Sequence, residues 1–167
     1  LGELRWEKLR GTAKEGKEIA QLTGGKLLEQ NQATVAAIKT NAAPKVLHLA
    51  THGYFLADQV KENKTIQAIQ AISSTRGMNS IGIIGENPLP RSGIVLAGAN
   101  QPSADGEEDG YLSALEVAKL DWKGTELVVL SACQSGLGEI KSGEGVYGLK
   151  RAIAVAGARS SLLSLWK

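Results

Sequence analysis

Two short apolar runs in this chain each end near a residue that can take part in nucleophilic catalysis. Residues 127–130 are four consecutive apolar residues, and they lead to Cys133, the only cysteine in the sequence. Residues 46–50 lead in the same way to His52, which precedes Gly53. A cysteine thiolate is a strong nucleophile, and a neighbouring histidine lowers its pKa or accepts its proton. The pattern predicts a Cys–His pair.

The position of Cys133 favours this chemistry over a structural role. A lone cysteine is usually a small buried hydrophobe. Here the cysteine follows the apolar run and precedes a glycine-containing stretch at 134–138. Short apolar runs bounded by turn signals predict buried parallel strands, and ligands bind beyond the carboxyl ends of such strands. We therefore expect Cys133 and His52 to meet at one edge of a sheet.

Two histidines compete for the role of base. His48 lies between Leu47 and Leu49, where we expect a core histidine bonded to a neighbour. His52 is expected after the strand, with an accessible side chain at a turn before Gly53. With His52 as base, the backbone N–H groups of Gly53 and Cys133 would face the developing oxyanion of an acyl transfer.

The remaining pattern predicts an α/β fold with a parallel sheet, because helical and apolar extended segments alternate. A capping box at Thr12–Glu15 would open a helix that ends at Gly24, and Ser113 and Glu116 form a second capping box. Gly157 would end another helix, which begins at Glu144. A further short helix is expected at 33–39. Strands are expected at 26–29, 44–50, 94–97, 125–132 and 160–166, and an insertion or mobile loop at 54–91.

Length and composition predict a single domain over residues 1–167, with a core that buries about 70% of the unfolded surface. The net charge of +2 gives no basis for a nucleic-acid partner, and no apolar run is long enough to span a membrane. A single cysteine cannot form an internal disulfide, so we expect a reducing, cytoplasmic setting. The chain starts at Leu1 and stops just after an apolar run, so we also expect a fragment of a longer protein.

Two other motifs resemble cofactor or metal sites. Residues 143–148 satisfy G-x-G-x-x-G, but no strand directly precedes them and no acidic residue lies about 20 residues later. Asp105, Glu107, Asp109, Gly110 and Glu116 nearly reproduce a calcium loop, but Glu107 stands where Asp or Asn is expected. A solvated acidic loop explains them better. We expect no cofactor and no metal.

Four motifs, in order along the chain, resemble those of CHAT domains. They are LHLATHG at 47–53, DGYLSALEV at 109–117, GTELVVLSACQSG at 124–136 and GEGVYGL at 143–149, continuing through AGAR at 156–159 to SLW at 164–166. The resemblance spans most of residues 10–167 and does not include the segment 54–91.

The resemblance implies a caspase-like α/β fold, with a mostly parallel central sheet and helices on both faces. It also implies a cysteine peptidase dyad, with His52 as base, Cys133 as nucleophile, and the Gly53 and Cys133 amides as oxyanion hole. Such domains typically follow tetratricopeptide or other sensor repeats in bacterial proteins. The expected partners are thus a protein or peptide substrate and N-terminal repeats. Asp109 is a candidate contact for a basic P1 residue.

Two alternatives stay open beside the peptidase. The first is a catalytically inert caspase-like scaffold for protein–protein interaction; the presence of both His52 and Cys133 argues against it. The second is a nucleotide-binding regulatory domain, which depends only on the weak glycine motif at 143–148.

Overall fold

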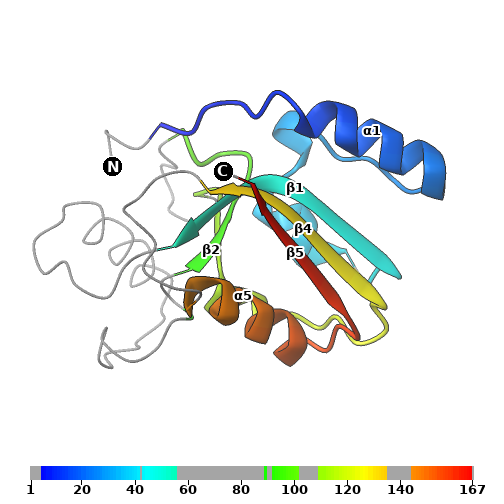
Figure 1. Cartoon of the computed structure of the whole chain (residues 1–167), viewed down its shortest axis with the longest axis vertical. Coiled ribbons are helices and arrows are strands. Elements are labelled where there is room, and N and C mark those ends of the chain that lie inside the picture. The colour runs from blue at the N-terminus through cyan, green and yellow to red at the C-terminus, as the bar shows by residue number, and fades with distance from the viewer. Residues whose placement is uncertain are drawn as a thin grey trace, which may run out of the picture.

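The computed structural model describes residues 5–41, 43–55, 89, 92–101, 109–134 and 144–166 (Figure 1). Most of the predicted insertion at 54–91 lies outside these ranges; Tyr54 and Phe55 belong to the first strand. The side chains of Cys133, Gln134, Leu165 and Trp166 are not described, so these residues are located by their backbone alone.

A five-stranded mixed sheet forms the centre of the structure, with strand order β3-β2-β1-β4-β5. The strands are β1 (Val46–Phe55), β2 (Ser92–Val95), β3 (Tyr111–Ser113), β4 (Leu127–Gln134) and β5 (Ser161–Trp166). β4 lies between β1 and β5 and runs parallel to both, whereas β2 pairs antiparallel with β1 and with β3. Only β2 therefore runs against the others, which confirms the predicted α/β fold with a mostly parallel sheet.

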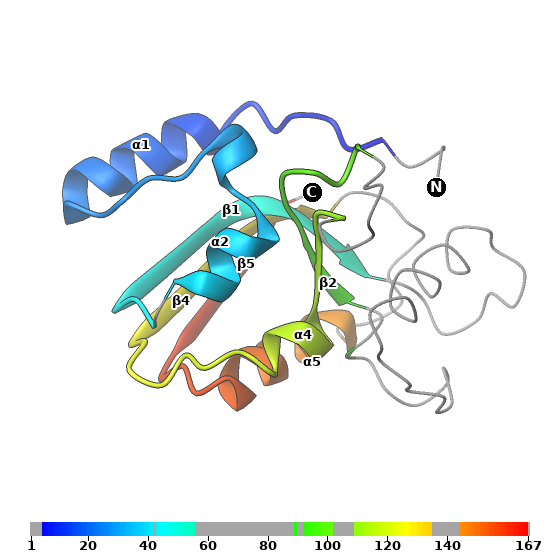
Figure 2. The ribbon, with the colours of Figure 1, turned by 180° about the vertical axis from the view of Figure 1, so that it is seen from behind.

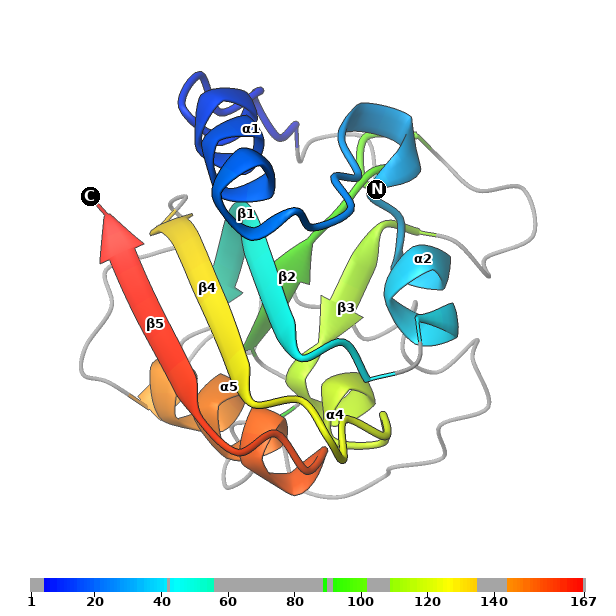
Figure 3. The same cartoon turned by 90° about the vertical axis from the view of Figure 1, so that its right-hand side faces the viewer.

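Helices cover both faces of the sheet, as expected. α1 (Thr12–Thr23) lies on one face and α5 (Glu144–Val155) on the other (Figures 1 and 3). Seen from behind, α2 (Val35–Thr40) lies between α1 and the short α4 (Ala114–Val117) (Figure 2). A bond of 3.2 Å between Lys39 Nζ and Glu116 Oε1 joins α2 to α4.

The main core lies between the sheet and α5. Along β4, Val128, Leu130 and Ala132 alternate with less buried residues, as a strand with one core face requires. Leu149, Ala152 and Ile153, at positions i, i+3 and i+4, form the buried stripe of α5, and Ala156 just after the helix extends it at i+7. Each fully buried Leu or Val contributes about 1.5–3 kcal/mol relative to an exposed one, so this contact fixes β4 firmly.

The predicted helix ends are partly confirmed. Gly24 adopts the left-handed conformation that ends α1 (φ 67°), and Ser113 and Glu116 form a complete capping box on α4. The predicted capping box of α1 is wrong. Gly11 is the N-cap, and the Thr12 hydroxyl donates to the carbonyl of Leu9 (3.0 Å) instead of accepting from the first turn.

Three element predictions differ from the structure. Residues 26–29 form no strand; Leu27 and Leu28 are adjacent apolar residues without alternation, and a 3₁₀ turn (Gln30–Gln32) follows them. α2 begins at Val35, two residues later than predicted, because Thr34 caps it. The predicted strand 94–97 is β2, which ends at Val95, where the chain turns and the Leu96 N–H donates to the carbonyl of Gly110 (2.7 Å).

Candidate active site

The parallel pairing of β1 with β4 brings His52 and Cys133 side by side. In the register of the two strands, His52 is the Cα partner of Cys133, and Gly53 is the partner of Gln134. Neighbouring strands in a sheet lie about 4.8 Å apart, so the two backbones are adjacent at this point. Residues 81 positions apart in sequence, the only cysteine and one of two histidines, thus meet on neighbouring strands.

The expectation that His52 follows its strand, at a turn, is wrong. β1 continues through His52 and Gly53 to Phe55, because its second half pairs antiparallel with β2, where His52 is the partner of Val95. Gly53 is buried and has register partners on both sides, Ile94 and Gln134. Cys133 likewise lies inside β4, one residue before its end, and not beyond it.

Alternation along β1 assigns the two histidines to one face of the sheet. Leu47 and Leu49 pack against the main core, so His48 and His52 lie on the opposite face, where α1 packs. His48 Nε2 lies 2.8 Å from Glu15 Oε1 on α1, and the His48 side chain is 16% exposed. The prediction that His48 is bonded to a neighbour is confirmed.

The ring of His52 is held by the chain segment that precedes α1. Its Nε2 lies 2.6 Å from the carbonyl oxygen of Glu7. A carbonyl oxygen can only accept a hydrogen bond, so Nε2 carries the proton. In the neutral imidazole, Nδ1 is then the nitrogen that accepts a proton. The indole of Trp6 packs against the same ring, with centroids 5.3 Å apart and planes at 46°.

Residues 5–10, here termed the N-terminal strap, are fixed to the loop that follows β2. The Trp6 N–H donates to Asn100 Oδ1 and Asn100 Nδ2 donates to the Trp6 carbonyl, both at 2.8 Å. Trp6 Nε1 donates to the hydroxyl of Tyr111 (2.8 Å). The sequence does not predict these contacts, because Trp6 and Asn100 are 94 positions apart and share no motif.

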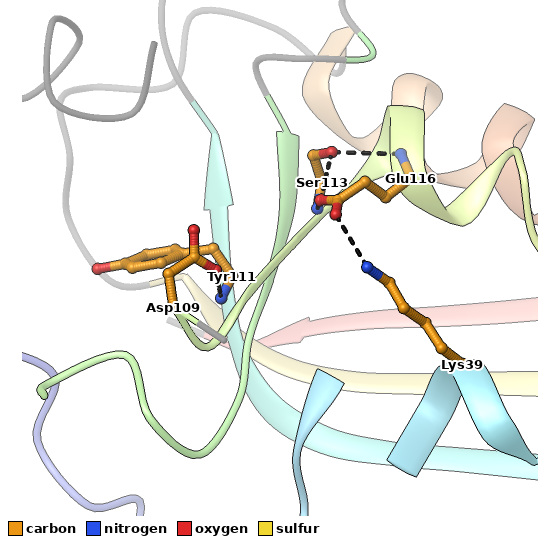
Figure 4. A network of polar contacts seen from close by, with 5 residues as sticks. All are labelled: Lys39, Asp109, Tyr111, Ser113 and Glu116. Carbon is orange, nitrogen blue, oxygen red and sulfur yellow. Dashed lines mark hydrogen bonds and ion pairs between the residues drawn. The ribbon is translucent and has the colours of Figure 1, made fainter. Parts of the chain in front are cut away.

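Asp109, the candidate contact for a basic P1 side chain, lies just before β3 and is 8% exposed. Its Oδ1 accepts a hydrogen bond from the Tyr111 N–H (3.0 Å; Figure 4). Burial raises the pKa of Tyr111 above its ordinary value; the hydrogen bond from Trp6 opposes this shift, and the charge of Asp109 adds to it. The Tyr111 phenol is therefore neutral at physiological pH.

Of the other acidic residues in the calcium-like motif, Glu116 has structural partners, and Asp105 and Glu107 lie outside the described residues. The carboxylate of Glu116 accepts from Ser113 and pairs with Lys39 (Figure 4), and residues 105–108 are not described. Across the ranges that the structure covers, no three or more His, Cys, Asp or Glu residues are grouped to hold a metal ion. None of the helices in these ranges is long and apolar enough to cross a bilayer.

One of three comparisons with known proteins identifies the family of this chain. Searches of curated proteins and of solved structures gave no significant match. The family model of the CHAT domain matches residues 1–167, the full length of the sequence. A match of this extent, together with a mixed α/β sheet in which His52 and Cys133 are adjacent, shows that the chain belongs to the CHAT domain family, which is caspase-like.

Proposed function

We propose that this domain is a cysteine endopeptidase in which Cys133 is the nucleophile and His52 the general base. The observation that carries the proposal is the register of β1 and β4, in which these two residues are partners. A nucleophile and its base must come within hydrogen-bond reach, and adjacent positions on parallel strands support such an approach. Membership of a caspase-like family supports the same chemistry.

In the proposed reaction, His52 Nδ1 takes the proton of the Cys133 thiol, and the thiolate attacks the carbonyl carbon of the scissile peptide. The tetrahedral intermediate collapses when His52 returns the proton to the leaving amine, which leaves a thioester on Cys133. His52 then takes a proton from water, and the resulting hydroxide attacks the thioester and breaks its C–S bond. His52 returns that proton to the Cys133 sulfur, which restores the thiol, and the carboxylic acid product leaves and loses its own proton to solvent. The bond between His52 Nε2 and the Glu7 carbonyl supports Nδ1 as the reacting nitrogen.

Developing negative charge on the substrate carbonyl requires hydrogen-bond donors. The proposed donors are the backbone N–H groups of Gly53 and Cys133, which belong to neighbouring strands and lie one register position apart. Loss of one such donor typically costs about 10²–10³ in rate.

Substrate choice and biological setting are also part of the proposal. Asp109 would select a basic P1 side chain by charge, and the domain would act as one module of a larger bacterial regulatory protein with N-terminal repeats or sensor domains. Asp109 is also buried and bonded to the Tyr111 N–H, which gives it a structural role beside the proposed contact with substrate. A comparison of P1 Arg with P1 Leu substrates separates the two: in Asp109→Asn, lost selectivity alters the ratio of the two rates, whereas a structural defect lowers both.

Hydrolysis of a fluorogenic peptide library varied at P1 tests the proposal. We expect turnover by the wild type, none by Cys133→Ala, and nearly none by His52→Ala, since the residues of a dyad act as a unit. His48→Gln is the matched control; it changes the other histidine of β1 and should retain turnover. Activity that survives in His52→Ala but is lost in His48→Gln would reverse the assignment. Absence of turnover by the wild type would favour the inert scaffold.

A further inference from the structure

We infer that Trp6 and Asn100 are positioning residues for His52, and that together they form a clamp that sets which ring nitrogen of this histidine carries the proton. The inference rests on the proposed function, in which His52 is the general base. It concerns residues outside the dyad, on the N-terminal strap and on the loop after β2, that reach the reaction only through the imidazole of His52.

Asn100 is the fixed side of the clamp. It belongs to a loop that two backbone hydrogen bonds tie to other parts of the chain, from the Leu96 N–H to Gly110 (2.7 Å) and from the Ala97 N–H to Ala33 (3.0 Å). A third bond, from the Gln101 N–H to Gly98 (2.8 Å), closes the loop on itself. Its side-chain amide then pairs with both polar groups of the Trp6 backbone. This reciprocal pair fixes the strap as one rung of a β-ladder would.

The Trp6 side chain is the second anchor. Its indole N–H donates to the hydroxyl of Tyr111, whose ring packs edge-on against Tyr54 at 5.9 Å. Tyr111 and Tyr54 are 7% and 1% exposed and, with Val95, form a small core of their own. The indole is therefore anchored to a buried cluster and packs in a tilted arrangement against the ring of His52.

The carbonyl that binds His52 belongs to the next residue, Glu7, which is itself exposed. The strap belongs to no helix or strand, so a free backbone there would sample many conformations, at a cost of about 1–2 kcal/mol per residue to fix. The hydrogen bonds of Trp6 offset part of that cost and hold the Glu7 carbonyl on Nε2. Without the clamp, the proton of the neutral ring would divide between Nε2 and Nδ1, and part of the population would lack a base at Nδ1.

The test uses variants of the clamp in the full chain. Asn100→Ala removes both hydrogen bonds to the Trp6 backbone. Asn100→Asp keeps an acceptor for the Trp6 N–H but loses the donor to the Trp6 carbonyl. Trp6→Phe keeps an aromatic ring but removes the indole donor. Lys8→Gln changes an exposed residue on the same strap and is the matched control. None of these positions belongs to the main core, and an unchanged far-ultraviolet circular dichroism spectrum establishes that each variant is folded.

Two readouts are measured for each variant. Long-range ¹H–¹⁵N NMR spectra report the tautomer of each imidazole, and the chain has only two histidines, assigned with His48→Gln. We expect the Nε2–H tautomer for His52 in the wild type and in Lys8→Gln, and mixed tautomers in Asn100→Ala. Peptide hydrolysis by Asn100→Ala should show kcat lowered about 10- to 100-fold with KM nearly unchanged, and Asn100→Asp and Trp6→Phe should be intermediate.

The two readouts separate failure of the inference from failure of the proposed function. A folded Asn100→Ala that keeps the wild-type tautomer of His52 would overturn the clamp, whatever the activity. A tautomer that changes in Asn100→Ala supports the clamp even where the wild type cleaves no peptide, and in that case only the peptidase proposal fails.

Discussion

The two histidines of β1 lie on one face of the sheet, yet their partners give them different chemistry. His48 is bonded to the carboxylate of Glu15, which fastens α1 to the sheet. His52 is bonded to a backbone carbonyl, which carries no charge and cannot take up a proton. An imidazole held in this way has one defined donor nitrogen and one nitrogen that can act as base. We therefore expect substitutions of His48 to affect stability and substitutions of His52 to affect turnover.

Tyr111 gives a pH-dependent prediction. Because its pKa in the folded chain is raised, its contribution to the free energy of unfolding is complete below pH 10.0, the ordinary pKa, and is lost as the pH rises through the higher folded value. Tyr111→Phe removes the acceptor for the Trp6 indole and should lower the free energy of unfolding by about 1 kcal/mol at neutral pH. Urea unfolding at neutral pH and at about pH 11 should show the difference between wild type and Tyr111→Phe shrinking; a constant difference contradicts this.

Among helices and strands, the sequence predicted the parallel part of the sheet better than the antiparallel part. The runs at 46–50 and 127–130 are mostly apolar and form β1 and β4, which pair with each other, and β4 also pairs with β5. β3 was missed because it has three residues, and β1 was ended too early because Gly53 resembles a turn signal. The partner that extends β1 past this glycine is β2, and local pattern does not reveal pairing between segments about 40 residues apart.

The capping box of α4 was found from sequence, and its contribution can be measured. Ser113 Oγ accepts from the Glu116 N–H (3.2 Å), and Glu116 Oε2 accepts from the Ser113 N–H (3.0 Å). Ser113→Ala should lower the free energy of unfolding by about 1–2 kcal/mol, since a partly buried N–H in the first turn loses its acceptor. Thr12→Ala is the control: its hydroxyl caps no helix, so chemical denaturation should show a smaller loss. Equal losses in the two variants would contradict the assignment of the caps.

Two glycines with nearly the same φ test the packing of the loop that carries Asn100. Gly110 has φ 71° and Gly24 has φ 67°. A Cβ at Gly110 would overlap the backbone nitrogen of Ala99, whereas at Gly24 it would meet no atom within 4 Å. Gly24→Ala should cost about 1–2 kcal/mol for the left-handed backbone alone, and Gly110→Ala should cost about 1–3 kcal/mol more from overpacking. Thermal unfolding of the two variants measures the difference. Equal losses of stability would show that the loop at Ala99 shifts without cost to accommodate the added Cβ.

Across the domain, the sequence predicts that His52 and Cys133 come together, but not the residues that hold His52 in place. His52 and Cys133 were identified because each follows an apolar run, and one-dimensional pattern carries that information. The strap, Asn100 and the buried tyrosines were not identified, because they come together only when the strap crosses the loop after β2. Such contacts depend on single side chains at large sequence separation and have no period to detect.

The most direct test of the proposed dyad is labelling of the folded protein with a peptidyl acyloxymethyl ketone, read out by intact mass. The wild type, Cys133→Ala, His52→Ala and the His48→Gln control are each treated with probes that carry different P1 side chains. We predict one adduct on the wild type and on His48→Gln, none on Cys133→Ala, and a greatly slowed reaction on His52→Ala. An unlabelled wild type, or labelling of Cys133 at the same rate without His52, would contradict the assignment of the dyad.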